Sequence, residues 1–133
     1  MKRLLFVCVE NSNRSQMAEA FARIHGGPDV EAYSSGSRQS GRVNPKAIEA
    51  MRELGYDLSR HGSKSLAEIP DAEYDFVATM GCGDACPLYP GKRYEDWELD
   101  DPAGQSVDAV RPIRDEIGQR VRVLLDSLDV PTA

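Results

Sequence analysis

The chain has 133 residues, of which 41% are hydrophobic and 29% charged, and this size and balance predict one globular domain around one core. Its 22 acidic residues outnumber its 16 basic ones, and no basic stripe marks a nucleic-acid partner. The first apolar run, residues 4–8, is too short for a signal peptide or a membrane span. We therefore expect a single domain over residues 1–133 that works in the cytoplasm without nucleic acid or membrane.

Strand and helix signals alternate along the first half of the chain. Residues 4–7 are apolar without polar alternation, which is typical of a strand buried on both faces of a parallel sheet. Apolar residues then recur at helical spacing over residues 15–24, until a Gly-Gly-Pro sequence ends the helix. A second strand is predicted over residues 30–34. The next helix begins at Asn44, a cap that precedes a first-turn proline, and ends at Gly55.

Two further strands and a long helix are predicted in the second half. Residues 75–80 form a strand that leads into a Gly- and Cys-rich loop, and a short strand lies near residues 97–99. The last helix has an apolar face from Ile113 to Leu128, and Pro112 is expected to mark a restart of that helix rather than its middle. Strands that alternate with helices predict an α/β fold, a single-domain three-layer sandwich in which helices flank a four-stranded parallel sheet.

Three cysteines, Cys8, Cys82 and Cys86, are an odd number, and the last two form a close pair. In a reducing compartment an odd count disfavours a scaffold of static disulfides. Each cysteine is therefore a buried hydrophobe, a metal ligand or a reactive thiol, and its neighbours in the sequence decide between these roles.

The loop between the first strand and the first helix is the strongest candidate for chemistry. Ligands of open α/β sheets collect at the carboxyl ends of strands, where a helix N-terminus offers N–H groups to an anion and favours a thiolate. The Cys8 thiol, the Arg14 guanidinium and the Ser15 hydroxyl, which can hydrogen-bond the sulfur, suit a nucleophile in an oxyanion cradle. The predicted cradle consists of Cys8, Val9, Glu10, Asn11, Ser12, Asn13 and Arg14.

The spacing of Cys8 and Arg14 alone is weak evidence for this interpretation. The alternative is that Cys8 is a small buried hydrophobe and Arg14 an ordinary first-turn residue. The buried strand, Ser15 and the amphipathic helix together favour the functional role. Glu10 has to face outward, because a carboxylate inside the cradle would repel an anion.

Four segments in this order carry a family resemblance: CVENSNR at 8–14, SQMAEAF at 15–21, NPKAIEAM at 44–51 and DDPAG at 100–104. Together they resemble the thioredoxin-coupled arsenate reductases, which share the fold of the low-molecular-weight protein tyrosine phosphatases. The resemblance covers nearly the whole chain. It implies a low-molecular-weight phosphatase-like fold and arsenate as the substrate, and we expect no cofactor and no metal.

The resemblance implies that Asp101 is the general acid, which protonates the departing hydroxyl. Its alternative role is that of a turn-forming residue before Pro102. The phosphatase branch continues with aromatic residues that clasp a phosphotyrosine ring, whereas Ala103 and Gly104 follow here. An aryl substrate would therefore lack aromatic side chains to contact at these two positions.

The resemblance also implies a relay of thiols, because the reduction of arsenate takes two electrons. Cys8 attacks arsenate and forms a covalent adduct, while Arg14 and the loop amides hold the oxygens. Cys82 then attacks Cys8 and releases arsenite, and Cys86 attacks Cys82 in turn. Thioredoxin reduces the resulting disulfide by ordinary exchange.

The spacer between Cys82 and Cys86 is shorter than the commonest family pattern, which leaves the terminal reductant open between thioredoxin, glutathione and mycothiol. Two other roles for this pair remain open. The two thiols could bind zinc with two further ligands, although His25 and His61 have no paired spacing, or they could be buried structural cysteines.

Some relatives bind a potassium ion beside the loop, through an acid that matches Glu19 and a serine that matches Ser34. A further acidic ligand of that site is replaced here by Lys64. Our hypothesis is that the Lys64 ammonium takes the place of the ion near Glu19.

These observations predict a cytoplasmic, thioredoxin-dependent arsenate reductase, with phosphate and sulfate as competing oxyanions. The nearest rival is a phosphatase that hydrolyses phosphomonoesters through a phosphocysteine at Cys8. A rival of another class is a redox-sensing or interaction protein that kept the fold and lost turnover. Trp97 is expected to be a core or loop anchor rather than a ligand contact.

Overall fold

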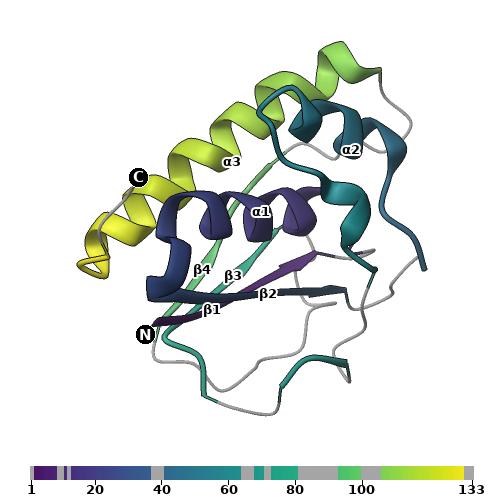
Figure 1. The fold of residues 1–133 in the computed structure, drawn as a ribbon. Coiled ribbons are helices and arrows are strands. Elements are labelled where there is room, and N and C mark those ends of the chain that lie inside the picture. The colour runs from purple at the N-terminus through teal and green to yellow at the C-terminus, as the bar shows by residue number, and fades with distance from the viewer. Residues whose placement is uncertain are drawn as a thin grey trace.

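One parallel sheet organises the chain. The computed structural model describes residues 2–8, 11, 13–36, 41–63, 68–70, 73–80, 93–99 and 106–130. The strands are β1 (Lys2–Cys8), β2 (Val30–Gly36), β3 (Phe76–Thr79) and β4 (Tyr94–Asp96), all parallel, in the order β2-β1-β3-β4. Figure 1 shows β1 between β2 and β3. The predicted α/β fold with its four-stranded parallel sheet is confirmed.

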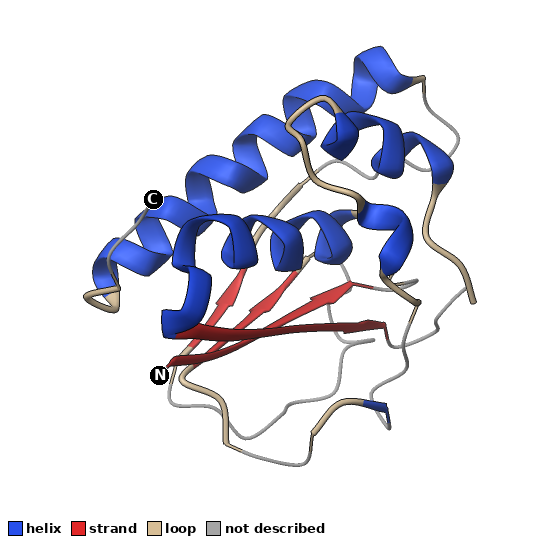
Figure 2. Ribbon diagram, viewed as in Figure 1, coloured by secondary structure: helices blue, strands red, loops and turns tan. Residues whose placement is uncertain are grey.

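The main helices lie on one side of this sheet, as Figure 2 shows. They are α1 (Arg14–Gly26), α2 (Pro45–Arg52) and α3 (Val107–Ser127), with the short 3-10 helices η1 (Gly27–Asp29) and η2 (Leu58–Arg60). The Asn44 side chain accepts a hydrogen bond of 2.8 Å from the Lys46 amide, which confirms the predicted N-cap of α2. None of the helices described is long and apolar enough to cross a membrane.

The two faces of β1 belong to two separate parts of the core. Leu4, Phe6 and Cys8 face the helices and join the main hydrophobic cluster, whereas Leu5 and Val7 pack with a smaller cluster that includes Ile69, Tyr74 and Val77. A strand that is buried on both faces needs apolar side chains at consecutive positions. The continuous apolar run in the sequence has this physical cause.

Helices α1 and α3 pack closely where Phe21 meets Gly118. A Cβ atom at Gly118 would lie 2.9 Å from Cε1 of the Phe21 ring, which is closer than carbon atoms pack. The glycine therefore lets the aromatic ring lie directly on the backbone of α3.

Helices α2 and α3 are joined by ion pairs around Glu53, just after α2. Arg111 and Arg114 of α3 each donate to its carboxylate, at 2.7 Å, and Arg114 also donates to the Ala50 carbonyl oxygen at 2.9 Å. The hydrogen bonds from Arg111 and then Arg114 lower the pKa of Glu53 to about 2. The Glu53 carboxylate therefore helps to hold α2 against α3, and this contribution is lost when acid protonates it.

Two predictions about individual elements were wrong. The short fourth strand is Tyr94–Asp96 rather than residues 97–99, because its side chains are exposed at the edge of the described sheet and show no apolar pattern. Helix α3 does not restart at Pro112 but runs through it. Proline removes one backbone hydrogen bond there, and the buried residues on both sides of it, such as Val110 and Ile117, keep the helix continuous by packing on the core.

Candidate active site

The carboxyl end of β1 brings Cys8 to the beginning of α1. Cys8 is the last residue of this central strand, pairs with Gly36 of β2 and is buried. Helix α1 begins six positions later, at Arg14, and has no acidic residue in its first turn. The sulfur thus lies at the carboxyl edge of a parallel sheet beside a helix N-terminus, where anions are favoured.

The Cys8 sulfur has a hydroxyl partner on α1. Its Sγ atom lies 2.8 Å from Ser15 Oγ, and the Asn11 side chain donates from Nδ2 to the same oxygen at 2.8 Å. Asn11 is fully buried and has a φ of 52°, the left-handed conformation that asparagine tolerates better than most residues. The loop therefore turns sharply at Asn11 and braces the serine against the sulfur.

Arg14 is buried at the same edge of the sheet. Its Nη1 atom donates to the Leu99 carbonyl oxygen at 3.2 Å, which ties the first turn of α1 to the segment that follows β4. Asp101, the predicted acid, is two residues beyond Leu99 in the sequence and lies outside the described residues. The guanidinium nevertheless places a fixed positive charge at the carboxyl end of the sheet.

A buried glutamine, Gln16, supports this loop through hydrogen bonds. Gln16 is fully buried, and its Nε2 atom contacts three oxygens: Asn11 Oδ1 at 2.8 Å, Asn11 O at 3.1 Å and Gly62 O at 2.9 Å. His61 contacts Gln16 Oε1 through Nδ1 at 2.9 Å, and the Tyr56 hydroxyl contacts His61 Nε2 at 2.6 Å. The sequence interpretation missed these three supporting side chains. A polar Gln16 on the inward face of an amphipathic helix was the one available signal.

Glu19 and Ser34, the positions that match potassium ligands in some relatives, lie together. Ser34 Oγ donates to Glu19 Oε1 at 2.6 Å, and Arg23 Nε donates to Glu19 Oε2 at 3.1 Å. A guanidinium already supplies positive charge to this carboxylate, which disfavours a potassium ion between Glu19 and Ser34. Lys64 lies outside the described residues, so the hypothesis that its ammonium takes the place of the ion is not tested.

Several predicted site residues fall outside the described part of the chain, and their structure is not described. They are Val9, Glu10, Ser12, Cys82, Cys86 and Asp101. Among the residues that are described, no group of three or more His, Cys, Asp or Glu side chains could hold a metal ion. The zinc interpretation of the cysteine pair is not tested, because both cysteines are among the residues not described.

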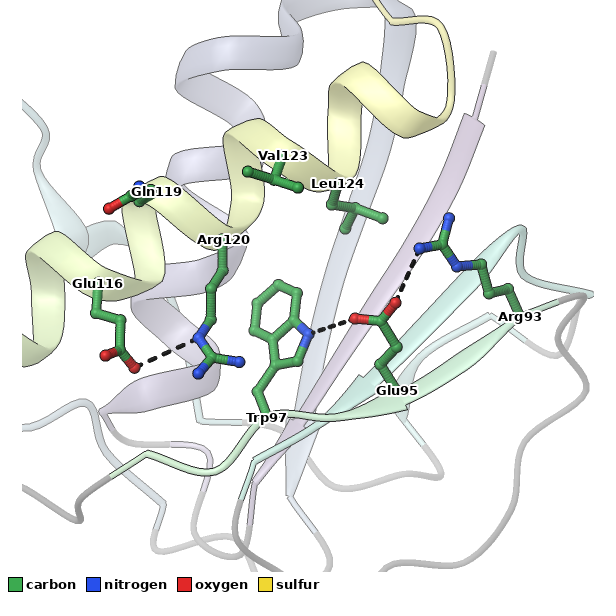
Figure 3. Close-up of a pocket in the computed structure, with 8 residues that line it drawn as sticks. All are labelled: Arg93, Glu95, Trp97, Glu116, Gln119, Arg120, Val123 and Leu124. Atoms are coloured by element: carbon green, nitrogen blue, oxygen red, sulfur yellow. Dashed lines mark hydrogen bonds and ion pairs between the residues drawn. The ribbon is translucent and has the colours of Figure 1, made fainter.

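Trp97 lines a pocket of about 400 Å³ between α3 and the β4 edge (Figure 3). Its side chain is buried, and its Nε1 atom donates to Glu95 at 3.0 Å. This hydrogen bond is the main cause that lowers the pKa of Glu95, and Arg93 also pairs with the carboxylate at 2.8 Å. Trp97 is therefore a core anchor, as predicted.

Comparison with known proteins places this site in a family. Residues 3–132 match the family model described as low molecular weight phosphotyrosine protein phosphatase. "Arsenate reductase 2" of Staphylococcus saprophyticus is 42% identical over 130 residues, 95% of this chain and 98% of that protein. The "glutaredoxin arsenate reductase" of Synechocystis is 40% identical over 128 residues, 94% of this chain and 97% of that protein.

Solved structures agree with these sequence matches. "An arsenate reductase in the phosphate binding state" superimposes with a TM-score of 0.86 at 39% identity and covers 96% of this chain and 98% of its own. A thioredoxin-dependent arsenate reductase of Corynebacterium glutamicum has a TM-score of 0.79 at 38% identity, over 97% of this chain and 62% of its own. The chain belongs to the low molecular weight phosphotyrosine protein phosphatase family, and the relatives to which it is similar are named arsenate reductases.

Proposed function

We propose that this protein reduces arsenate to arsenite, with Cys8 as the nucleophile. The single observation that carries the proposal is the geometry at the end of β1: a buried thiol 2.8 Å from the Ser15 hydroxyl, at the start of a helix that begins with a buried arginine. A tetrahedral oxyanion fits this environment, because the helix N-terminus and the guanidinium are both positive. The relatives named arsenate reductases support arsenate as that oxyanion.

The first step forms a bond between the Cys8 sulfur and arsenic. Arg14 holds oxygens of arsenate, and the bond from the Ser15 hydroxyl stabilises the attacking thiolate. One arsenate oxygen leaves as water, and Asp101 supplies the proton for it. The product is a covalent adduct in which arsenic is still in its oxidised form.

The second and third steps carry out the reduction. Cys82 attacks the Cys8 sulfur, a disulfide forms, and the electron pair of the broken sulfur–arsenic bond stays on arsenic, which leaves as arsenite. Cys86 then attacks Cys82, so that Cys8 is released as a thiolate and a Cys82–Cys86 disulfide remains. Two electrons from the thiols thus reduce one arsenate, and the enzyme needs an external dithiol to restart.

Thioredoxin is the reductant that we propose, and the cytoplasm is the compartment, because the relay needs a pool of reduced dithiols. The thioredoxin-dependent structural relative supports this choice, whereas the relative named glutaredoxin arsenate reductase makes glutaredoxin the alternative donor. Phosphate and sulfate should compete with arsenate, because the cradle recognises tetrahedral oxyanions. The arsenate reductase structure in the phosphate binding state supports that expectation.

The competing function is phosphomonoester hydrolysis, which the family description raises. Water would then release phosphate from a Cys8 phosphocysteine, and Cys82 and Cys86 would have no role. The two further thiols and the Ala103-Gly104 sequence in place of aromatic residues favour the reductase.

The test is arsenate-dependent consumption of NADPH with thioredoxin and thioredoxin reductase. We expect turnover by the wild type and none by the Cys8→Ser, Cys82→Ser or Cys86→Ser variants. Turnover that survives the loss of both Cys82 and Cys86 would contradict the relay. Hydrolysis of an aryl phosphate without any arsenate turnover would favour the phosphatase instead.

A further inference from the structure

A continuous row of hydrogen bonds runs from Tyr56, beyond the end of α2, to the sulfur of Cys8. The partners in order are Tyr56 Oη, His61 Nε2 and Nδ1, Gln16 Oε1 and Nε2, Asn11 Oδ1 and Nδ2, Ser15 Oγ and Cys8 Sγ. The five bonds are 2.6, 2.9, 2.8, 2.8 and 2.8 Å long. Gln16, Asn11, Ser15 and Cys8 are almost completely buried, whereas Tyr56 and His61 are partly exposed.

The direction of the row follows from Gln16. Its Nε2 atom faces the backbone carbonyl oxygens of Asn11 and Gly62, which can only accept hydrogen bonds. The amide nitrogen must therefore lie on that side, and Oε1 must face His61. For the same reason the Asn11 side chain presents its oxygen to Gln16 and its nitrogen to Ser15.

This orientation determines which nitrogen of His61 donates to Gln16. Because Gln16 Oε1 has no hydrogen, His61 Nδ1 must carry the proton, and Glu19 Oε2 at 3.4 Å favours the proton at the same position. In the neutral ring Nε2 is then an acceptor, and the Tyr56 hydroxyl donates to it. Burial raises the pKa of Tyr56, which keeps the phenol protonated as this role requires.

The row ends at the Cys8 sulfur. The Ser15 oxygen accepts the hydrogen bond from Asn11, which leaves its own hydrogen for Cys8 Sγ, its second partner. With the His61 ring neutral, all five donors point toward Cys8. Hydrogen bonds aligned in one direction polarise one another, and in a buried site with little water the effect is larger.

We propose that Tyr56 and His61 are positioning residues for Cys8, which align the buried amides of Gln16 and Asn11 so that the Ser15 hydroxyl donates to the nucleophile. Neither side chain needs to touch the substrate for this role. Without His61 the Gln16 oxygen would lose its donor, and the row could adopt other orientations. The inference rests on the proposed function only in that Cys8 is the reacting thiol.

The test uses a protein in which Cys8 is the only thiol. The chain has three cysteines, so the Cys82→Ser/Cys86→Ser variant is the parent. Into it we would introduce Tyr56→Phe, His61→Leu and His61→Asn, whose side-chain amide can replace the Nδ1–H donor. Tyr33→Phe is the matched control, because Tyr33 lines the same pocket of about 560 Å³ as Tyr56 and is not part of the row.

Two measurements at one neutral pH report on Cys8: the rate of its alkylation by iodoacetamide and the ultraviolet absorbance of its thiolate. We expect His61→Leu to lower the alkylation rate roughly tenfold, the usual worth of one hydrogen bond, and Tyr56→Phe to lower it by about two- to fivefold. His61→Asn should restore most of the loss, and Tyr33→Phe should match the parent. A purely structural role predicts no rescue by asparagine and no change in Tyr56→Phe, and either result would overturn the proposal.

These measurements do not depend on arsenate turnover. If the variants respond as expected and the wild type does not reduce arsenate, the positioning role stands and the proposed function fails. If the wild type reduces arsenate and all variants alkylate at the rate of the parent, the positioning role fails alone.

Discussion

Replacing Ser15 by alanine removes the hydroxyl that contacts the Cys8 sulfur. In the structure Ser15 Oγ lies 2.8 Å from that sulfur and also accepts a hydrogen bond of 2.8 Å from Asn11. The Ser15→Ala variant therefore loses a donor to the nucleophile and leaves the Asn11 amide without its hydroxyl acceptor. It changes neither the apolar contacts of Cys8 nor the backbone of α1.

The expected size of the effect follows from the charge of the thiolate. A hydrogen bond to a charged group contributes about 1.5–3 kcal/mol, and tenfold corresponds to about 1.4 kcal/mol, so the ratio of thiolate to thiol at Cys8 should fall roughly 10- to 100-fold. The lost hydrogen bond from the buried Asn11 amide should also lower the free energy of unfolding by about 0.5–1.5 kcal/mol.

The assay is alkylation of Cys8 in the Cys82→Ser/Cys86→Ser parent, together with kcat/KM for arsenate in the full relay. Ser35→Ala is the control, because Ser35 is equally buried, its hydroxyl has no hydrogen-bond partner among the described residues, and it points to the other face of the sheet. If Ser15→Ala and Ser35→Ala both react at the rate of the parent, the Ser15 hydroxyl does not activate Cys8, and the reasoning is refuted.

Three other predictions concern the fold and its ions. Gly118→Ala should lower the free energy of unfolding by about 1–2 kcal/mol in a urea titration, because its Cβ would meet the Phe21 ring at 2.9 Å, and unchanged stability would contradict that contact. The pKa of Glu53 is lowered from 4.5 to about 2, so its ion pairs stabilise the fold fully above pH 4.5, and this contribution is lost as the pH falls toward 2. The melting temperature of the wild type should therefore drop more steeply between these two pH values than that of Glu53→Gln, and equal slopes would refute the ion-pair argument. Potassium should raise neither activity nor melting temperature relative to sodium, because Arg23 already pairs with Glu19, and a potassium-specific gain would show that this site takes an ion.

The sequence predicted those features that depend on local patterns. Strand β1 could be predicted because a strand buried on both faces needs a continuous apolar run. Helix α1 could be predicted because a surface helix needs apolar residues at a period of 3.6. The Asn44 cap was visible for the same kind of reason, since its partner is only two residues away. The position of Cys8 beside Ser15 follows from these neighbouring elements.

The supporting row behind Cys8 could not be predicted in this way. His61 and Gln16 are 45 positions apart in the sequence, and only the folded chain brings the loop after α2 against α1. Edge strand β4 was displaced in the prediction because exposed residues carry no burial pattern. The path of α3 through Pro112 depends on packing against the core, which overrides a local preference.

The relay itself is tested most directly by trapping its first disulfide. The Cys86→Ser variant keeps Cys8 and Cys82 but lacks the thiol that would resolve their bond. After a single exposure to arsenate, we expect a stoichiometric release of arsenite and a Cys8–Cys82 disulfide in the peptide mass map. Release of arsenite with both thiols still free, or no release and no disulfide, would contradict the relay.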